Sequence, residues 1–175
     1  MIEALAGKIA NKIKRADEQN TAHVEVLKYG LIIVINYALP VVASLTIGWI
    51  TNQFSGTLFS VLAFTLLRLA SGGFHFKSAN VCTVVSILII SIPPHVSLSD
   101  HWITICTAVS LLLIFILAPA NIRGYARMPE KYFPIMKIVS VLIVGSNLLW
   151  HSSILAIVFI VQGVLLLPLR REVKS

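Results

Sequence analysis

The stretch R-L-A-S-G-G-F-H-F-K-S-A-N-V-C, residues 68–82, decides how the first half of this chain folds. Its chemically informative residues are Arg68, Gly72, Gly73, His75 and Cys82. Steps of seven residues separate Arg68, His75 and Cys82, so an unbroken helix would hold them on one face, about 10.5 Å apart per step. Paired glycines weaken a helix and permit a turn. We therefore expect the chain to break at Gly72-Gly73 and to fold His75 back against Cys82.

The composition around this stretch is that of a membrane protein. Of 175 residues, 57% are hydrophobic and 12% are charged, whereas soluble domains are about one quarter charged. The apolar residues form long blocks, which predict an all-α polytopic protein. A net charge of +7 is compatible with nucleic-acid binding. The basic residues border apolar blocks and form no hydrophilic domain, however, so no nucleic-acid partner is expected.

The apolar blocks predict about six transmembrane helices in a single membrane domain, a bundle over residues 29–168. A basic tail, residues 169–175, follows the bundle. Several blocks are short, so the spans are expected to extend into flanking polar residues, to tilt or to re-enter. The six blocks are residues 29–50, 57–70, 81–92, 102–117, 138–150 and 154–167.

The distribution of positive charge predicts the orientation. All 14 Lys and Arg residues precede the first block, follow the last, lie in the second and fourth connections, or, for Arg68, lie at the end of the second block. The first, third and fifth connections, residues 51–56, 93–101 and 151–153, carry none. By the positive-inside rule, both termini and residues 68–82 are expected on the cytoplasmic side of the membrane.

The N-terminal segment, residues 1–22, has the pattern of an amphipathic helix. Its apolar residues recur with the period of one helix face, and lysine and arginine fill other positions. One interpretation is a solvated helix that packs on the body of the protein. The other is an interfacial helix that contacts anionic membrane lipids. The pattern is compatible with both.

Cys82 is the candidate nucleophile. A cysteine attacks as its thiolate, which a nearby imidazole or cation makes available. His75 is the candidate base, and Arg68 adds positive potential or binds a carboxylate. The competing interpretation is that Cys82 is a small apolar filler at the start of a helix. A lone arginine at membrane depth favours the functional interpretation, because such residues are costly and usually functional.

The pattern R-x3-G-G-x-H-x6-C from Arg68 to Cys82 resembles the signature of the accessory gene regulator B (AgrB) family. The sequence A-P-A-N at residues 118–121, followed by a basic stretch, is similar to the family's second cytoplasmic region, although this match is looser. The length, the expected six spans and the amphipathic start also fit. The resemblance therefore covers essentially the whole chain.

The resemblance implies a membrane cysteine endopeptidase of bacterial quorum sensing. Such proteins cleave a short (AgrD-like) precursor peptide, hold the product as an acyl-thioester and promote its cyclisation into an autoinducing peptide. By the same resemblance, Cys82 is the nucleophile and His75 the base, and Arg68, Gly72 and Gly73 support the site. It also implies a homodimer in the cell membrane of a bacterium, with the active site at the cytoplasmic side. No cofactor or metal is expected.

Basic residues after the fourth block have two interpretations. The candidates for binding the precursor are Arg123, Arg127 and Lys131, because the resemblance implies a precursor with an acidic tail. Alternatively, they only set the topology and contact lipid headgroups. For the whole protein, the rival classes are a small transporter or exporter with Arg68 and His75 lining its pathway, and a non-catalytic membrane scaffold.

Overall fold

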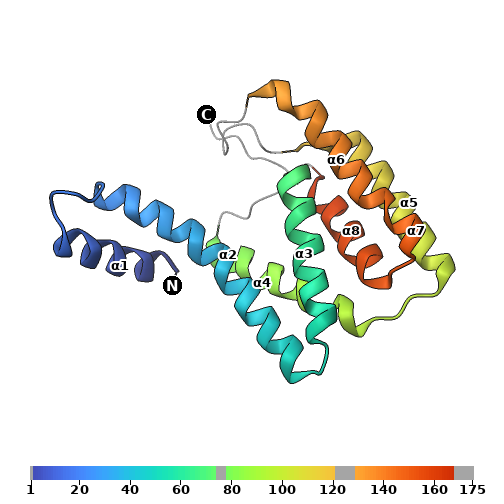
Figure 1. Cartoon of the computed structure of the whole chain (residues 1–175), viewed down its shortest axis with the longest axis horizontal. Helices are drawn as coiled ribbons and strands as arrows, with labels where there is room; N and C mark the ends of the chain where they lie inside the picture. Colours follow the sequence, from blue (N-terminus) through green and yellow to red (C-terminus); the bar gives the residue numbers. More distant parts are fainter. Residues whose placement is uncertain (1, 74–77, 121–128, 168–175) are drawn as a thin grey trace.

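The computed structural model describes residues 2–73, 78–120 and 129–167, and its regular elements there are helices. Figure 1 shows their arrangement. The α-helices are α1 (Ile2–Ala16), α2 (Val24–Ile50), α3 (Phe54–Ser71), α4 (Ala79–Ser91), α5 (Asp100–Leu117), α6 (Phe133–Gly145), α7 (Asn147–Trp150) and α8 (Ser153–Leu165). Two 3₁₀ turns, η1 (Pro93–His95) and η2 (Glu130–Tyr132), precede α5 and α6. The predicted all-α class is confirmed.

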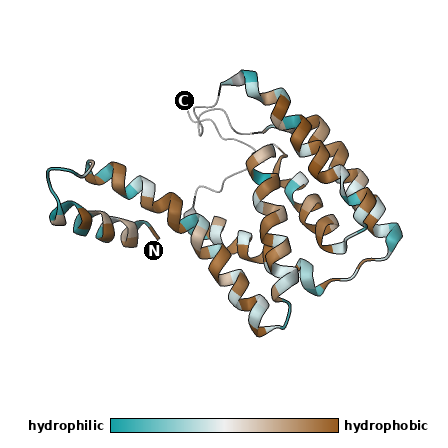
Figure 2. Ribbon diagram, in the orientation of Figure 1, coloured by the Kyte–Doolittle hydropathy of each residue, from teal (hydrophilic) through white to brown (hydrophobic). Residues whose placement is uncertain are grey.

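Four helical segments among the described residues are long and apolar enough to cross a membrane: α2, α3, α5 and the α6–α7 unit Phe133–Trp150. Two other apolar helices, Asn80–His95 and Ser153–Leu165, are shorter. Large apolar side chains on the outer surface of the spans are exposed, among them Leu112 (60%) and Phe115 (63%). Figure 2 shows these helices as mostly hydrophobic. Such a surface suits lipid better than water, so the chain is a membrane protein.

The helix α3 occupies the centre of the bundle, with α2 and α4 on one side and α6 and α8 on the other (Figure 1). Its buried side chains Phe64 and Leu67 share a core with Val158 and Phe159 of α8. At its start, a Cβ added to Gly48 would come within 2.7 Å of the Thr57 Cβ, so α2 and α3 pack without room for a side chain there. This packing holds α3 between α2 and α8.

The connections without positive charge meet at one end of the bundle. The loop before α5 is joined to the start of α8 by a hydrogen bond from the Leu98 N–H to Ser153 Oγ (3.1 Å). Thr51, after α2, contacts the His95 ring at 3.3 Å. The ends of α3 and α5 meet instead at the opposite end, where Gly72 pairs with Ala120. The alternation of charge along the sequence thus corresponds to two distinct ends of the structure.

Asn147 forms a buried set of hydrogen bonds at the end of the bundle where the connections without positive charge meet. Its side chain is fully buried, and Nδ2 donates hydrogen bonds to Thr107 Oγ1 (2.9 Å) and to the Ser152 carbonyl (3.2 Å). Asn147 Oδ1 accepts from the Ser152 N–H at 2.9 Å. Because amide groups are costly to bury unpaired, these bonds fix α5, α7 and the start of α8 together.

The helix α1 packs along the first half of α2, and this pair projects from the bundle (Figure 1). Ile2, Ala6 and Ala10 form its buried face. Lys14 Nζ closes the turn by donating to the carbonyls of Glu18 (2.7 Å) and Thr21 (2.8 Å). This packing on α2 is compatible with both interpretations of the segment, and both stay predictions.

Candidate functional site

The break at the paired glycines is the first feature of the site. The helix α3 ends at Ser71, and its last turn is closed by a hydrogen bond from the Gly72 N–H to the Arg68 carbonyl (2.9 Å). Gly72 has φ of 73° and Gly73 has φ of 139°, a region that side-chain-bearing residues rarely adopt. The predicted interruption of the helix at Gly72-Gly73 is therefore confirmed.

Backbone pairing joins this break to the segment after α5. The Gly73 N–H donates to the Ala120 carbonyl (3.1 Å), and the Ala120 N–H donates to the Ser71 carbonyl (3.0 Å). Together these bonds form a short parallel bridge between Gly72 and Ala120. The two sequence patterns at residues 68–82 and 118–121 are 36 positions or more apart in the chain. The structure brings the first directly against the start of the second.

Gln162 of α8 reaches the same break with its amide. Its side chain is fully buried. Nε2 donates to the Gly72 carbonyl at 2.7 Å and to Ser71 Oγ at 3.0 Å, while Oε1 accepts a long hydrogen bond from Arg68 Nη1 at 3.5 Å. A third helix therefore contributes to the site, beside α3 and α4.

The Arg68 guanidinium lies half-buried one turn before the break. Besides its contact with Gln162, it lies over the Phe64 ring, with Cζ 5.6 Å from the ring centroid. It also interacts electrostatically with Cys82 of α4 and Tyr37 of α2. An aromatic ring of its own helix and a buried amide of α8 thus hold the guanidinium beside the break.

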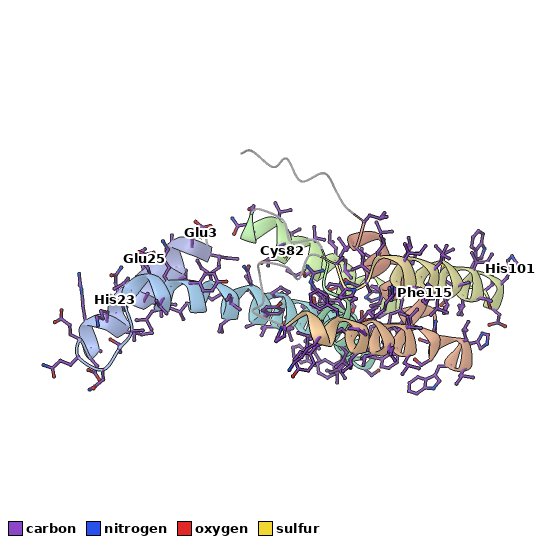
Figure 3. The ribbon with its side chains drawn as sticks, turned by 90° about the horizontal axis from the view of Figure 1, so that it is seen from above. Glu3, His23, Glu25, Cys82, His101 and Phe115 are labelled. Carbon is purple, nitrogen blue, oxygen red and sulfur yellow. The ribbon has the colours of Figure 1, made fainter. Side chains whose placement is uncertain are left out.

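Cys82 lies in the first turn of α4, where its N–H donates to the Ser78 carbonyl (3.1 Å). Its thiol is free and partly exposed, and Figure 3 shows it far from His101 at the start of α5. The first turn of a helix favours negative charge because its N–H groups are unpaired. The neighbouring Thr83 hydroxyl contacts Asn36 Oδ1 at 3.3 Å, which ties the start of α4 to α2.

Several predicted site residues lie outside the described residues. They are His75, Arg123 and Arg127. Lys131 is described: its side chain is exposed, and its Nζ lies 5.0 Å from the centroid of the Tyr132 ring. Of the predicted residues, the structure therefore groups Arg68, Gly72 and Gly73, and it places Cys82 in the first turn of the next helix, α4. The approach of His75 to Cys82 stays a prediction.

Sequence reasoning missed the residues that come from distant helices. Gln162 forms hydrogen bonds at the break, and Tyr37 lies within range of the Arg68 charge; both come from segments assigned only as spans. Gln162 did carry a signal, because it is the one strongly polar residue between residues 154 and 167. An amide within an apolar span usually binds a partner on another helix. Tyr37 carried none, since tyrosine is common near membrane surfaces.

No group of three or more His, Cys, Asp and Glu side chains comes together within residues 2–73, 78–120 and 129–167. His95, in one of the connections without lysine or arginine, contacts the Thr51 hydroxyl instead. The described part of the site therefore consists of a thiol, a guanidinium, an amide and backbone groups.

These features define a polytopic helical membrane protein with a thiol and an arginine beside a glycine break at one end of its bundle. The family model for accessory gene regulator B matches residues 6–167, and the chain belongs to this family. Membership implies a role in the accessory gene regulator system of quorum sensing. No solved structure matches the chain significantly.

Curated relatives agree with this assignment. A protein of Halalkalibacterium halodurans described as AgrB-like is 28% identical over an alignment of 181 positions, which covers 99% of this chain and 90% of the relative. Accessory gene regulator protein B of Staphylococcus intermedius is 28% identical over 125 residues, covering 68% and 66% of the two chains. An AgrB-like protein of Clostridium perfringens is 30% identical over 89 residues, covering 51% and 42%.

Proposed function

We propose that this chain is a membrane cysteine endopeptidase that cleaves a short precursor peptide and promotes its cyclisation into an autoinducing peptide. The observation that supports this most is the break of α3 at Gly72-Gly73, where the Arg68 guanidinium meets the buried Gln162 amide and after which Cys82 lies in the first turn of the next helix, α4. The break directs the chain away from α3 two residues before His75. Membership of the accessory gene regulator B family supports the same activity.

In the first step, Cys82 Sγ attacks the carbonyl carbon of the scissile peptide bond. His75 takes the thiol proton and gives it to the leaving amine as the C–N bond breaks. The N-terminal part of the precursor then remains bound to Sγ as an acyl-thioester. Arg68 supplies positive potential beside Cys82, which favours the thiolate and the negative charge that develops on the attacked carbonyl oxygen.

In the second step, a thiol or hydroxyl of the bound peptide attacks the thioester carbonyl. The bond to Cys82 Sγ breaks, the proton of the attacking group passes to the cysteine through His75, and a thiolactone or lactone ring is released. Water must be kept away from the thioester, so that cyclisation is faster than hydrolysis. A site at the membrane surface would help to restrict water.

We further propose that six helices span the bacterial cell membrane, with both termini and the site on the cytoplasmic side. The two shorter apolar helices would complete the count together with flanking residues. The clustering at one end of the bundle of the connections that carry no lysine or arginine supports this orientation. A homodimer and contacts with anionic lipids belong to the same proposal.

A small transporter or exporter is the rival class, and Cys82 separates the two. A peptidase cannot replace its nucleophile with alanine or serine without a large loss of peptide processing. A transporter with Arg68 and His75 in its pathway should tolerate either substitution at Cys82 and should lose transport when Arg68 is replaced.

Precursor capture gives a second test. If Arg123 and Arg127 attract an acidic segment of the precursor, Arg123→Glu with Arg127→Glu should weaken processing by about tenfold, because attraction becomes repulsion. The loss should shrink when salt is raised. Processing by the variant is measured in membranes after its topology has been mapped. Unchanged processing with correct topology would remove the idea and leave these residues as topology determinants.

A further inference from the structure

We infer that Gln162 is a positioning residue of the cysteine site, and that through it α8 sets the direction in which the chain leaves α3 toward His75. This inference rests on the proposed peptidase function. Gln162 is fully buried and contacts Arg68, Ser71 and Gly72, the three residues around the end of α3.

The backbone hydrogen bonds at the break show what the amide contributes. The Ser71 carbonyl accepts from the Ala120 N–H, the Gly72 N–H donates to the Arg68 carbonyl, and the Gly73 N–H donates to the Ala120 carbonyl. The Gly72 carbonyl accepts a hydrogen bond from Gln162 Nε2 at 2.7 Å and a long one from Ser71 Oγ at 3.5 Å. Among the described residues, the donors to this carbonyl are therefore side chains, and the closer of the two belongs to α8.

The amide also joins the turn to the charged group of the site. An amide carries both donors and an acceptor, so Gln162 can hold the Gly72 carbonyl with Nε2 while Oε1 faces Arg68 Nη1. Ser71 completes the arrangement, since its hydroxyl donates to the Leu67 carbonyl (2.7 Å) and accepts from Gln162 Nε2. Neither leucine nor glutamate can make the whole set, because leucine has no polar atom and a carboxylate cannot donate.

Close packing makes the position of Gly73 depend on the same side chain. A Cβ at Gly73 would lie 3.2 Å from Gln162 Nε2 and 3.3 Å from Arg68 Nη1. The amide thus lies directly against the residue from which the chain continues toward His75. A shift of about 1 Å in a supporting residue is enough to cost a large part of the reactivity of a catalytic group.

The test uses iodoacetamide as a substrate-free probe of Cys82, on the full chain in detergent and in a Cys106→Ser background. In Gln162→Leu, alkylation of Cys82 at neutral pH should fall about tenfold, toward the rate of an ordinary thiol that is only a few per cent ionised. His75→Ala should cause a similar fall. In Gln162→Glu, whose side chain has the same shape, Cys82 should also lose reactivity. This variant provides the test if Gln162→Leu does not fold.

Asn147→Leu is the matched control. Asn147 is equally buried and its amide makes a comparable set of hydrogen bonds, but at the opposite end of the bundle. If Gln162 acts on the site, Asn147→Leu should keep Cys82 within about twofold of the parent rate, although it destabilises the bundle.

The outcomes separate this inference from the proposed function. Loss of reactivity in both Gln162 variants and in His75→Ala, with Asn147→Leu unaffected, supports it. If His75→Ala loses reactivity and the Gln162 variants do not, the inference is wrong and the peptidase proposal stands. Equal losses in Asn147→Leu and Gln162→Leu would show that Gln162 affects Cys82 only through the general stability of the bundle, and the inference would be wrong. If His75→Ala changes nothing, the proposed histidine-activated thiol fails, and the inference fails with it.

Discussion

Replacing Gly73 with alanine is expected to abolish most of the reactivity of Cys82 and to destabilise the protein. Gly73 has φ of 139°, which costs a residue with a side chain about 1–3 kcal/mol. The new Cβ would also press on Gln162 Nε2 and Arg68 Nη1, both within 3.3 Å. We expect the unfolding transition in detergent to move to lower temperature and iodoacetamide labelling of Cys82 to slow by about tenfold.

Gly30→Ala is the matched control for this prediction. Gly30 lies within α2, and a Cβ added there meets nothing within 4 Å. Alanine is a better helix former than glycine by about 1 kcal/mol, so this substitution should leave stability unchanged or raise it. Labelling of Cys82 should not change. If Gly73→Ala behaved like Gly30→Ala in both assays, the turn at Gly72-Gly73 would not have the role assigned to it.

Replacing Cys82 with serine is expected to reduce peptide processing on the order of a thousandfold or more, because a serine hydroxyl is a far weaker nucleophile without a strong base. The substitution exchanges one sulfur for one oxygen, so folding should be preserved. Processing is measured as the appearance of the cyclised peptide in membranes that contain the precursor and the variant.

The second cysteine provides the control for that experiment. Cys106 lies within α5, and Cys106→Ser should process the precursor at the parent rate. The wild-type chain should also accumulate a covalent acyl adduct on Cys82 that is absent in Cys82→Ser. Full processing by Cys82→Ser would exclude the peptidase mechanism and would favour the transporter class.

The sequence was most informative where local chemistry determines structure. Paired glycines predicted the interruption of the helix at Gly72-Gly73, because glycine alone adopts such backbone angles without strain. The apolar blocks predicted the helices, and their ends differ from the prediction by a few residues. The first helix of the bundle, for example, begins at Val24 and not at residue 29. Polar residues beside an apolar block can continue a helix, so hydropathy does not mark its start.

Contacts between distant segments were beyond prediction from one sequence. Nothing in the local sequence indicates that Ala120 pairs with Gly72. Nor does it indicate that Gln162 forms a hydrogen bond to Gly72, which lies 90 positions earlier. Both contacts follow from the way α3 packs against α8 and from the end of α5 lying beside the end of α3. Polar residues in apolar spans signal that a partner exists, but they do not identify it.

The central claim is that His75 activates Cys82, and one measurement tests it without a substrate. Alkylation of Cys82 and of Cys106 is followed across a range of pH in the purified protein, with and without His75→Ala. The account predicts that Cys82 labels fast near neutral pH, much faster than Cys106, and that His75→Ala removes this difference. Slow labelling of both cysteines, unaffected by His75→Ala, would contradict it.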